Sequence, residues 1–355
     1  MAGAKQAQRR NAAAANWFEG KSLPAVNWLI ARSYGERAPA PATITASAIV
    51  ALLTISVAAA ALLMHGAGLA IDLLAPSTLG FALAFVVLGA IRWACRAGAS
   101  PMRRAARDMA EYFGLFTAIA LTGAVASYPI AAGSHGFADP LLQRSDLALH
   151  FNWLDWYRAV AAHPMLQAAS RTAYAMIYVS PAILLGYLAI TDQRREAHEF
   201  IAAVWLAAAI TLAAFRFMPA IGPFAYLWHG PIPYLPVSDL WQPHLIPRLR
   251  DHDVLLIDLG RLVGLVSAPS FHAASGVLLI AFAWRQPRIR GLLVAINLAM
   301  LLATPVEGTH YLTDMILGAL VAVAALSLVA GLRAWPARAP IASSRGNGLL
   351  PAQLP

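Results

Sequence analysis

Long apolar stretches with almost no charged residues constrain this 355-residue chain more than any other feature. A helix needs about 20 apolar residues to cross hydrocarbon, and it pairs every backbone polar group internally. We therefore predict an all-α polytopic membrane protein with about eight transmembrane helices. The stretches are too long and continuous for β-barrel strands, which are alternating segments of about ten residues. The predicted spans are 44–64, 78–94, 110–132, 172–190, 198–218, 270–284, 290–306 and 311–332.

Composition excludes three other classes of protein. Hydrophobic residues make up 59% of the chain and charged residues only 12%, whereas a soluble globular domain carries about 25% charged residues. A disordered chain would have few apolar residues and many charges. A disulfide scaffold needs paired cysteines, and Cys95 is the only cysteine.

The basic residues are distributed unevenly between the two sides of the predicted bundle. Nineteen of the 26 lie in the two tails and in the loops after the second, fourth and sixth spans. The positive-inside rule places this side, with both termini, in the cytoplasm. The net charge of +9 therefore does not indicate nucleic-acid binding. We expect an inner or plasma membrane protein without a removable signal peptide. The seven basic residues left on the outer side are Arg144, Arg158, Arg171, Arg216, Arg248, Arg250 and Arg261.

Polar residues cluster at the predicted outer ends of the sixth and eighth spans. Pro269, Ser270 and His272 open the sixth span, where free backbone N–H groups and the helix dipole favour an anion. In the eighth span, His310 and Asp314 are four residues apart and share a helix face. Asp314 can therefore orient the imidazole and leave its outer nitrogen basic. Because a carboxylate inside an apolar span is costly unless it is paired, we interpret this pair as functional.

Two other groups of polar residues near these motifs are not expected to take part in the chemistry. Glu307 is expected to be a solvated acid at the start of the eighth span, although it could instead influence the pKa of His310. Asp251-His252-Asp253 lies in the long outer loop 219–269. Adjacent side chains seldom converge on one ion, so no metal site is expected there. This loop and the loop 133–171 are rich in Trp, Tyr, Pro and His, which is typical of the headgroup layer.

The two motifs resemble those of the type-2 phosphatidic acid phosphatase superfamily. The segment Pro269-Ser270-Phe271-His272 is similar to its Pro-Ser-Gly-His motif, and His310-Tyr311-Leu312-Thr313-Asp314 to the end of its Ser-Arg-x5-His-x3-Asp motif. Both segments are closer to the branch that includes inositol phosphorylceramide synthases. The resemblance covers about residues 110–332 and implies a six-helix core behind two extra helices. The implied organisation is a cytoplasmic tail (1–43), two extra transmembrane helices (44–108), the phosphatase/phosphotransferase core (109–333) and a flexible cytoplasmic tail (334–355).

The sequence departs from this family pattern at the phosphate-binding positions. Ala303 and Thr304 stand where the Ser-Arg pair is expected, and the first motif, Lys-x6-Arg-Pro, is reduced to Arg216 near Pro219. Phosphoryl oxygens need hydrogen-bond donors. The outer arginines near the motifs are the candidates, although each could equally be a snorkelling interfacial residue. These candidates are Arg216, Arg248, Arg250 and Arg261.

The resemblance implies metal-independent phosphoryl transfer, without a cofactor, on a phospholipid or isoprenoid (pyro)phosphate at the outer membrane face. His310 would form a phosphohistidine, Asp314 would orient it, and His272 would be the general acid and base. Ser270 and the arginines would bind the phosphoryl oxygens. Water as acceptor would make the protein a lipid phosphatase, and an alcohol such as inositol would make it a headgroup transferase. The alternative is a transporter or lipid-binding protein that uses the same cluster, although no inverted repeat is evident. The sequence does not indicate an oligomeric state.

Overall fold

The computed structural model describes residues 43–97, 100–238 and 240–334. This part of the chain is almost entirely helical, and seven of its helices are long and apolar enough to cross a membrane. They coincide with seven of the eight predicted spans, which confirms an all-α polytopic membrane protein. The seven are α3 (Ala46–Gly66), α4 (Pro76–Ala94), α5 (Pro101–Ala132), α8 (Pro164–Ile190), α9 (Arg194–Phe215), α13 (Arg290–Glu307) and α14 (Leu312–Ala334).

The remaining predicted span forms a shorter helix, α12 (Phe271–Trp284), which has 14 residues. At 1.5 Å per residue it is about 21 Å long, whereas the hydrocarbon core is about 30 Å thick. Its first turn meets α14 at Gly318, where a Cβ atom would overlap the carbonyl oxygen of Ser270. Gly318 is about 9 Å along α14 from Leu312. The start of α12 is therefore recessed within the bundle.

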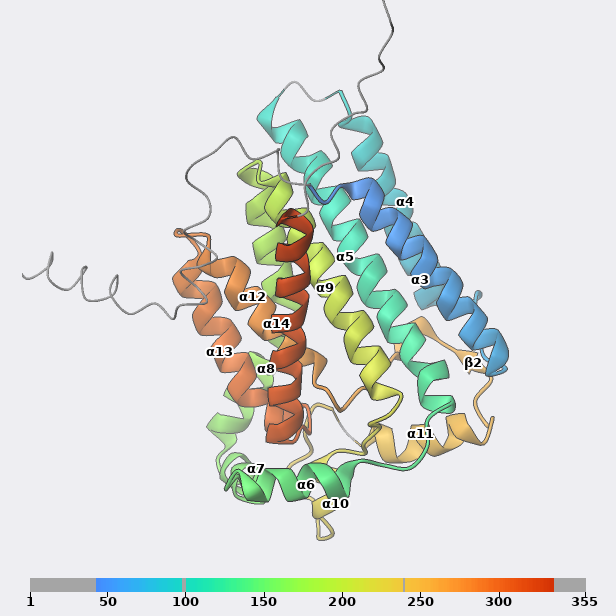
Figure 1. Ribbon diagram of the computed structural model, residues 1–355, viewed down its shortest axis with the longest axis vertical. Coiled ribbons are helices and arrows are strands. Elements are labelled where there is room, and N and C mark those ends of the chain that lie inside the picture. The colour runs from blue at the N-terminus through green and yellow to red at the C-terminus, as the bar shows by residue number, and fades with distance from the viewer. Residues whose placement is uncertain (1–42, 98–99, 239, 335–355) are drawn as a thin grey trace, which may run out of the picture. The chain divides into compact units, whose positions relative to one another are not determined.

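The spanning helices alternate in direction, so their connections fall at two opposite ends of the bundle (Figure 1). One end carries the short helices of the two long predicted loops, namely α6 (Asp139–Ala148), α7 (Trp153–Ala161), α10 (Pro223–Leu227) and α11 (Trp241–Arg250). The loop 219–269 continues into β2 (Leu256–Ile257) and the 3-10 turn η1 (Leu259–Arg261). Strand β2 pairs in parallel with β1 (Ala70–Ile71), so this loop is tied to the connection between α3 and α4.

Helix α12 is central, and the two N-terminal helices are peripheral. α12 packs against α8, α9, α13 and α14, whereas α3 and α4 both pack against α5. α4 has no buried residue. Its exposed apolar side chains, among them Leu83 and Val86, suit contact with lipid. The central position of α12 therefore places its first turn among four other helices.

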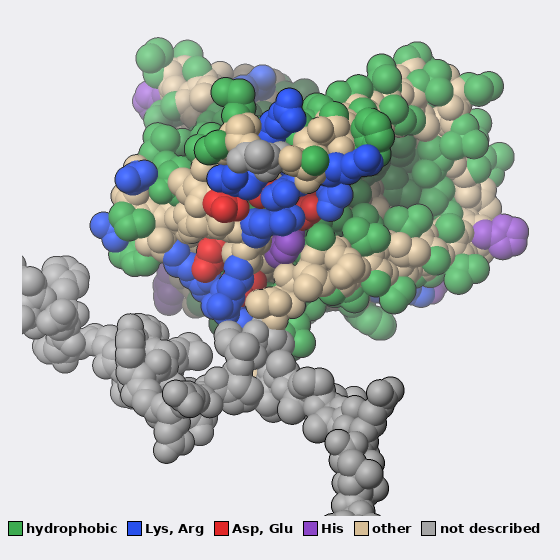
Figure 2. All heavy atoms as spheres, turned by 90° about the horizontal axis from the view of Figure 1, so that it is seen from above, with side chains coloured by type: hydrophobic (Ala, Val, Ile, Leu, Met, Phe, Trp, Pro, Cys, Tyr) green, Lys and Arg blue, Asp and Glu red, His purple; other side chains and the backbone are tan. Residues whose placement is uncertain are grey.

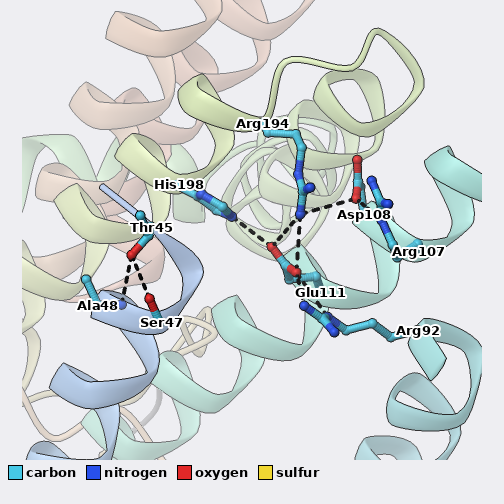
Figure 3. A network of polar contacts seen from close by, with 9 residues as sticks. All are labelled: Thr45, Ser47, Ala48, Arg92, Arg107, Asp108, Glu111, Arg194 and His198. Atoms are coloured by element: carbon cyan, nitrogen blue, oxygen red, sulfur yellow. Dashed lines mark hydrogen bonds and ion pairs between the residues drawn. The ribbon is translucent and has the colours of Figure 1, made fainter. Parts of the chain in front are cut away.

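Arginines gather at the end of the bundle opposite α6 and α11 (Figure 2). Beneath them, buried Glu111 accepts hydrogen bonds from Arg92 of α4 and from His198 of α9 (Figure 3). Arg194 of α9 lies 3.4 Å from the same carboxylate. Because a buried carboxylate needs such partners, this network joins α4, α5 and α9 at the basic end. The predicted tails, 1–43 and 334–355, lie almost wholly outside the described residues.

Candidate active site

His310 and Asp314 meet at the beginning of α14. Nδ1 of His310 lies 3.3 Å from Oδ1 of Asp314, and the two residues are 3% and 0% exposed. The helix begins at Leu312, two residues later than His310. Thr309, with φ at +49°, turns the chain sharply between α13 and this point. The other oxygen of Asp314 accepts a hydrogen bond from the amide of Tyr311 at 3.2 Å. Asp314 is thus fixed on one side by the backbone and faces the imidazole with the other.

His272 faces the same space from the first turn of α12. Its ring centroid lies 6.0 Å from that of His310, at an interplanar angle of 54°. Tyr174 of α8 stacks on the ring of His272, with centroids 4.6 Å apart. No hydrogen bond to a described residue occupies the ring nitrogens of His272. The structure therefore brings together the two histidines predicted from the sequence, and Tyr174 sets the plane of one of them.

Ser270 joins the start of α12 to the first turn of α14. Its Oγ accepts a hydrogen bond from the amide of Ala273 at 3.3 Å and so caps α12. Its own amide donates to the carbonyl oxygen of Asp314 at 3.0 Å. A hydroxyl can donate its hydrogen while its oxygen accepts, and none of the described residues accepts the hydrogen of Ser270. Ser270 therefore begins α12 and contacts the backbone of Asp314, while its predicted role in binding phosphate stays a prediction.

Asp146 of α6 holds the start of α14, a role that sequence reasoning missed. Its carboxylate accepts hydrogen bonds from the amides of Leu312 and Thr313, each at 2.8 Å, and from the Thr313 hydroxyl at 2.7 Å. These amides are among the unpaired donors that begin every helix. A carboxylate 166 residues away in the sequence replaces the usual local cap. The position of α14, and with it the position of His310, depends on this contact.

A second carboxylate of α6, Asp139, holds the loop that follows α9. It accepts hydrogen bonds from the amides of Ile221 and Gly222, each at 3.0 Å, and from the hydroxyl of Tyr311 at 3.0 Å. Burial raises the pKa of Asp139. Gly222 has φ at +89° and lies so close to Thr309 that a Cβ atom would contact its carbonyl oxygen at 2.8 Å. Asp139 therefore fixes the residues on either side of His310.

Glu307 is buried, so the expectation of a solvated acid at the start of the eighth span is wrong. It is the last residue of α13 and is 0% exposed. Its carboxylate accepts hydrogen bonds from the hydroxyl of Tyr234 at 2.7 Å and from the amide of Val237 at 3.2 Å. Arg171 of α8 donates to the same Tyr234 hydroxyl at 2.8 Å. Burial raises the pKa of Tyr234 to about 12, so this hydroxyl stays protonated at neutral pH. Glu307 thus anchors the loop 219–269 to α13.

The four candidate arginines have different surroundings. Arg216 is half-buried at the end of α9, and its guanidinium lies beside Gly133 without a hydrogen-bond or ion-pair partner in the described part of the chain. Arg250 donates to the hydroxyl of Ser134 at 2.9 Å, and burial lowers its pKa. Arg248 is exposed. The side chain of Arg261 is 88% exposed, and its Nε lies 3.6 Å from a carboxylate oxygen of Asp258.

The segment that follows Arg216 reaches the motif residues. Ala220 accepts a hydrogen bond from the hydroxyl of Ser267 at 3.0 Å, three residues before Ser270. Gly222 contacts Thr309, next to His310. Arg216 therefore combines a guanidinium that has no hydrogen-bond or ion-pair partner among the described residues with a backbone segment that reaches both motifs.

The described residues hold no cluster of metal ligands, either at the candidate site or away from it. No group of three or more His, Cys, Asp or Glu side chains among these residues is placed to hold a metal ion. In the sequence triplet Asp251-His252-Asp253, Nδ1 of His252 lies 3.1 Å from the carbonyl oxygen of Ala67. This contact ties the end of α11 to the end of α3.

Comparison with known proteins gives one match. A family model described as the PAP2 superfamily, the type-2 phosphatidic acid phosphatases, matches residues 140–328, just over half of the chain. The matched range holds both histidines, Asp314, Ser270 and all four candidate arginines. Neither the curated proteins nor the solved structures give a match. This family model covers most of the helical core and both motifs. The chain therefore belongs to the PAP2 superfamily of membrane proteins, and this membership suggests a membrane lipid phosphatase.

Proposed function

We propose that this protein is a metal-independent lipid phosphatase or phosphotransferase that works through a phosphohistidine. The observation that carries the proposal is the contact between Nδ1 of His310 and the buried carboxylate of Asp314, with the ring of His272 6.0 Å away. With its proton on Nδ1 toward Asp314, His310 presents an unprotonated Nε2 to the space shared with His272. A buried base held by a carboxylate and facing a second titratable ring is typical of nucleophilic catalysis.

In the first step, Nε2 of His310 attacks the phosphorus of a lipid phosphate ester. A P–N bond forms, and the bond from phosphorus to the lipid or headgroup oxygen breaks. His272 in its protonated form donates its proton to the leaving oxygen, which departs as an alcohol. The phosphorylated imidazole gains positive charge, and the carboxylate of Asp314 stabilises it at Nδ1.

In the second step, the now neutral His272 removes a proton from water or from an alcohol. The acceptor oxygen attacks phosphorus, and the P–N electron pair returns to Nε2 of His310. With water, the products are an alcohol and a free phosphate. With an alcohol such as inositol, the group held on Nε2 moves to the acceptor oxygen. This group is a phosphoryl group when the substrate is a monoester, and a phosphate-bearing headgroup when the substrate is a diester that has lost its lipid oxygen. The same residues serve both reactions, so the acceptor decides the name of the enzyme.

Three sources of donors are available for the phosphoryl oxygens. The hydroxyl of Ser270 can donate, because its oxygen already accepts from Ala273. The first amides of α12 contribute the positive end of the helix dipole. Arg216 supplies a guanidinium that can donate two hydrogen bonds, in the motif that has lost its lysine. Arg248, Arg250 and Arg261 remain candidates, although Arg250 and Arg261 already have protein partners.

The same arrangement supports a reaction at the outer face of the membrane. The candidate site adjoins the start of α14, which Asp146 of α6 caps. The arginine-rich end of the bundle is opposite the end that carries α6 and α7 (Figures 1 and 2). The positive-inside rule assigns the arginine-rich end to the cytoplasm. We infer that both termini are cytoplasmic and that the lipid headgroup reaches the histidines from the extracytoplasmic side.

The test is an activity assay on the purified full-length protein. Phosphatidate and isoprenyl phosphates are presented in mixed micelles, and inorganic phosphate is measured with and without inositol. A phosphatidylinositol arm follows transfer of phosphoinositol to an added alcohol. We expect turnover with at least one substrate, its loss in His310→Gln, and wild-type rates in His229→Ala, which changes an exposed loop histidine. Equal activity in His310→Gln and wild type would exclude the proposed nucleophile.

A further inference from the structure

An elongated apolar cavity runs into the bundle from the wall that carries His272. It has a volume of about 420 Å³ and lies between α5, α8, α9, α12 and the segment 259–266. This volume is within the range of about 300–1,000 Å³ that holds small-molecule ligands in proteins. On α5 its wall extends from Phe116 to Ser127, which is about 16 Å of helix. The cavity therefore has the shape of a slot.

The cavity wall suits hydrocarbon. Within the described part of the chain, no Lys, Arg, Asp or Glu side chain lines it. Its polar lining residues are Thr117, Ser127, Tyr178, Thr211, His272 and Ser275. The side chains between them are aliphatic or aromatic, so a charged headgroup would lose its solvation there, whereas an alkyl chain would gain contacts.

The cavity meets the candidate active site and also reaches the surface of the bundle. His272 lines the cavity and also faces His310, at 6.0 Å between ring centroids. Tyr178 of α8, another lining residue, is 79% exposed. In a membrane, this surface is covered by lipid tails. A lipid can therefore place its phosphate at the histidines and its chain in the slot.

A pair of phenylalanines marks the far end of the slot. The rings of Phe116 and Phe200 are stacked, with centroids 6.1 Å apart and an interplanar angle of 8°. Phe282 supports Phe200 edge-on, with centroids 5.3 Å apart. Rigid aromatic side chains packed in this way form a wall that a hydrocarbon chain cannot displace cheaply.

We propose that one hydrocarbon chain of the substrate lipid lies inside the bundle in this slot, and that Phe116 and Phe200 limit its length. This inference rests on the proposed function for the position of the phosphate. The chain in the slot can come from a single-chain isoprenyl or alkyl phosphate, or from one chain of a two-chain phospholipid. The selective feature is the length of the chain that enters.

Photolabelling tests occupancy of the slot without turnover. The full-length protein is labelled with an alkyl phosphate that carries a diazirine at its chain end, and the labelled peptides are mapped. We expect labels on α5 between Phe116 and Ser127 and on α9 between Val204 and Leu212, in wild type and in His310→Gln. Labels confined to lipid-facing surfaces such as α4 would overturn the proposal. If the slot is labelled but the protein has no phosphatase activity, the proposed function fails and this inference stands.

Chain-length selectivity tests the role of the phenylalanines. Alkyl phosphates, isoprenyl phosphates and phosphatidates of increasing chain length are compared by kcat/KM. Phe116→Ala should raise the ratio of kcat/KM for long over short chains by about tenfold, since each methylene in an apolar pocket is worth about that factor. Phe113→Ala is the matched control, because Phe113 lies on the same helix but outside the cavity wall. An unchanged ratio in Phe116→Ala, or the same change in both variants, would refute the length limit.

Discussion

Replacement of Asp314 by Asn separates the orienting role of this residue from its shape. Asn has the same size, and its carbonyl oxygen can still accept the hydrogen bond that Tyr311 donates at 3.2 Å. Its NH₂ group would then face Nδ1 of His310 and donate to it. This contact selects the tautomer that carries its proton on Nε2, which is the nitrogen that must attack phosphorus. The Asp314→Asn variant therefore keeps the packing around position 314 and moves the proton of His310 from Nδ1 to Nε2.

The expected loss follows from the geometry of the pair. At the observed separation of 3.3 Å, a unit charge pair in an effective dielectric constant of about 20 is worth about 5 kcal/mol. This energy stabilises the positively charged, phosphorylated His310 and is lost in the neutral variant. Each 1.36 kcal/mol corresponds to about a tenfold change in rate, so kcat should fall by roughly 10³- to 10⁴-fold. KM should change little, because Asp314 is buried behind His310 and reaches the substrate only through it.

The assay is single-turnover release of the leaving alcohol, compared between wild type, Asp314→Asn and Asp155→Asn. Asp155 is a surface residue of α7 whose ion pair with Arg158 is exposed, so its replacement should leave the rate unchanged. The melting temperature of each variant in detergent reports whether the fold survives. A folded Asp314→Asn variant that retains more than a tenth of the wild-type rate would refute the orienting role.

Three further predictions test the surroundings of the site. Asp146→Ala should leave the first amides of α14 unpaired and destabilise the protein by about 2–4 kcal/mol. Its melting temperature in detergent and its activity should both fall, and unchanged values would refute the role of Asp146 as the cap of α14. Arg216→Ala should lower kcat/KM by about 10- to 100-fold, as expected for a lost charge-assisted contact to a phosphoryl group. Arg261→Ala should change kcat/KM less than about twofold, because this residue is exposed and ion-paired. A larger loss in Arg261→Ala than in Arg216→Ala would place the phosphate site near Arg261 instead. Overnight EDTA treatment should leave the rate unchanged, whereas recovery of a lost rate by added Mg²⁺ or Zn²⁺ would contradict metal-independent chemistry.

The long apolar segments could be located from the sequence because each forms a helix that is apolar enough for the hydrocarbon core and pairs its own backbone polar groups. Spans such as 44–64 and 78–94 agree with α3 and α4 within a few residues. The segment 270–284 was harder, because α12 is short and lies inside the bundle, where protein replaces lipid around its ends. Its apolar run indicated a helix, but not one whose first turn is recessed.

The residues of the site were predictable where their spacing is local. His310 and Asp314 are only four residues apart, and the sequence predicted their contact, although His310 lies just before α14 and not on a shared helix face. The partners of Glu307 and the cap by Asp146 come from segments 70 and 166 residues away, and no local pattern encodes such pairings. A partial signal existed, because buried carboxylates must find donors and α6 carries Asp139 and Asp146 in an otherwise apolar protein. The stacking of Tyr174 on His272 likewise follows only from the packing of α8 against α12.

In the proposed mechanism, His310 becomes covalently phosphorylated during turnover. The most direct measurement is rapid acid-free denaturation of the protein during turnover with a ³²P-labelled lipid phosphate, followed by peptide mapping of the label. We expect a label that is stable in alkali and labile in acid, that maps to His310, and that disappears in His310→Gln. Phosphate release by wild type without such a label, or a label on another residue, would contradict it.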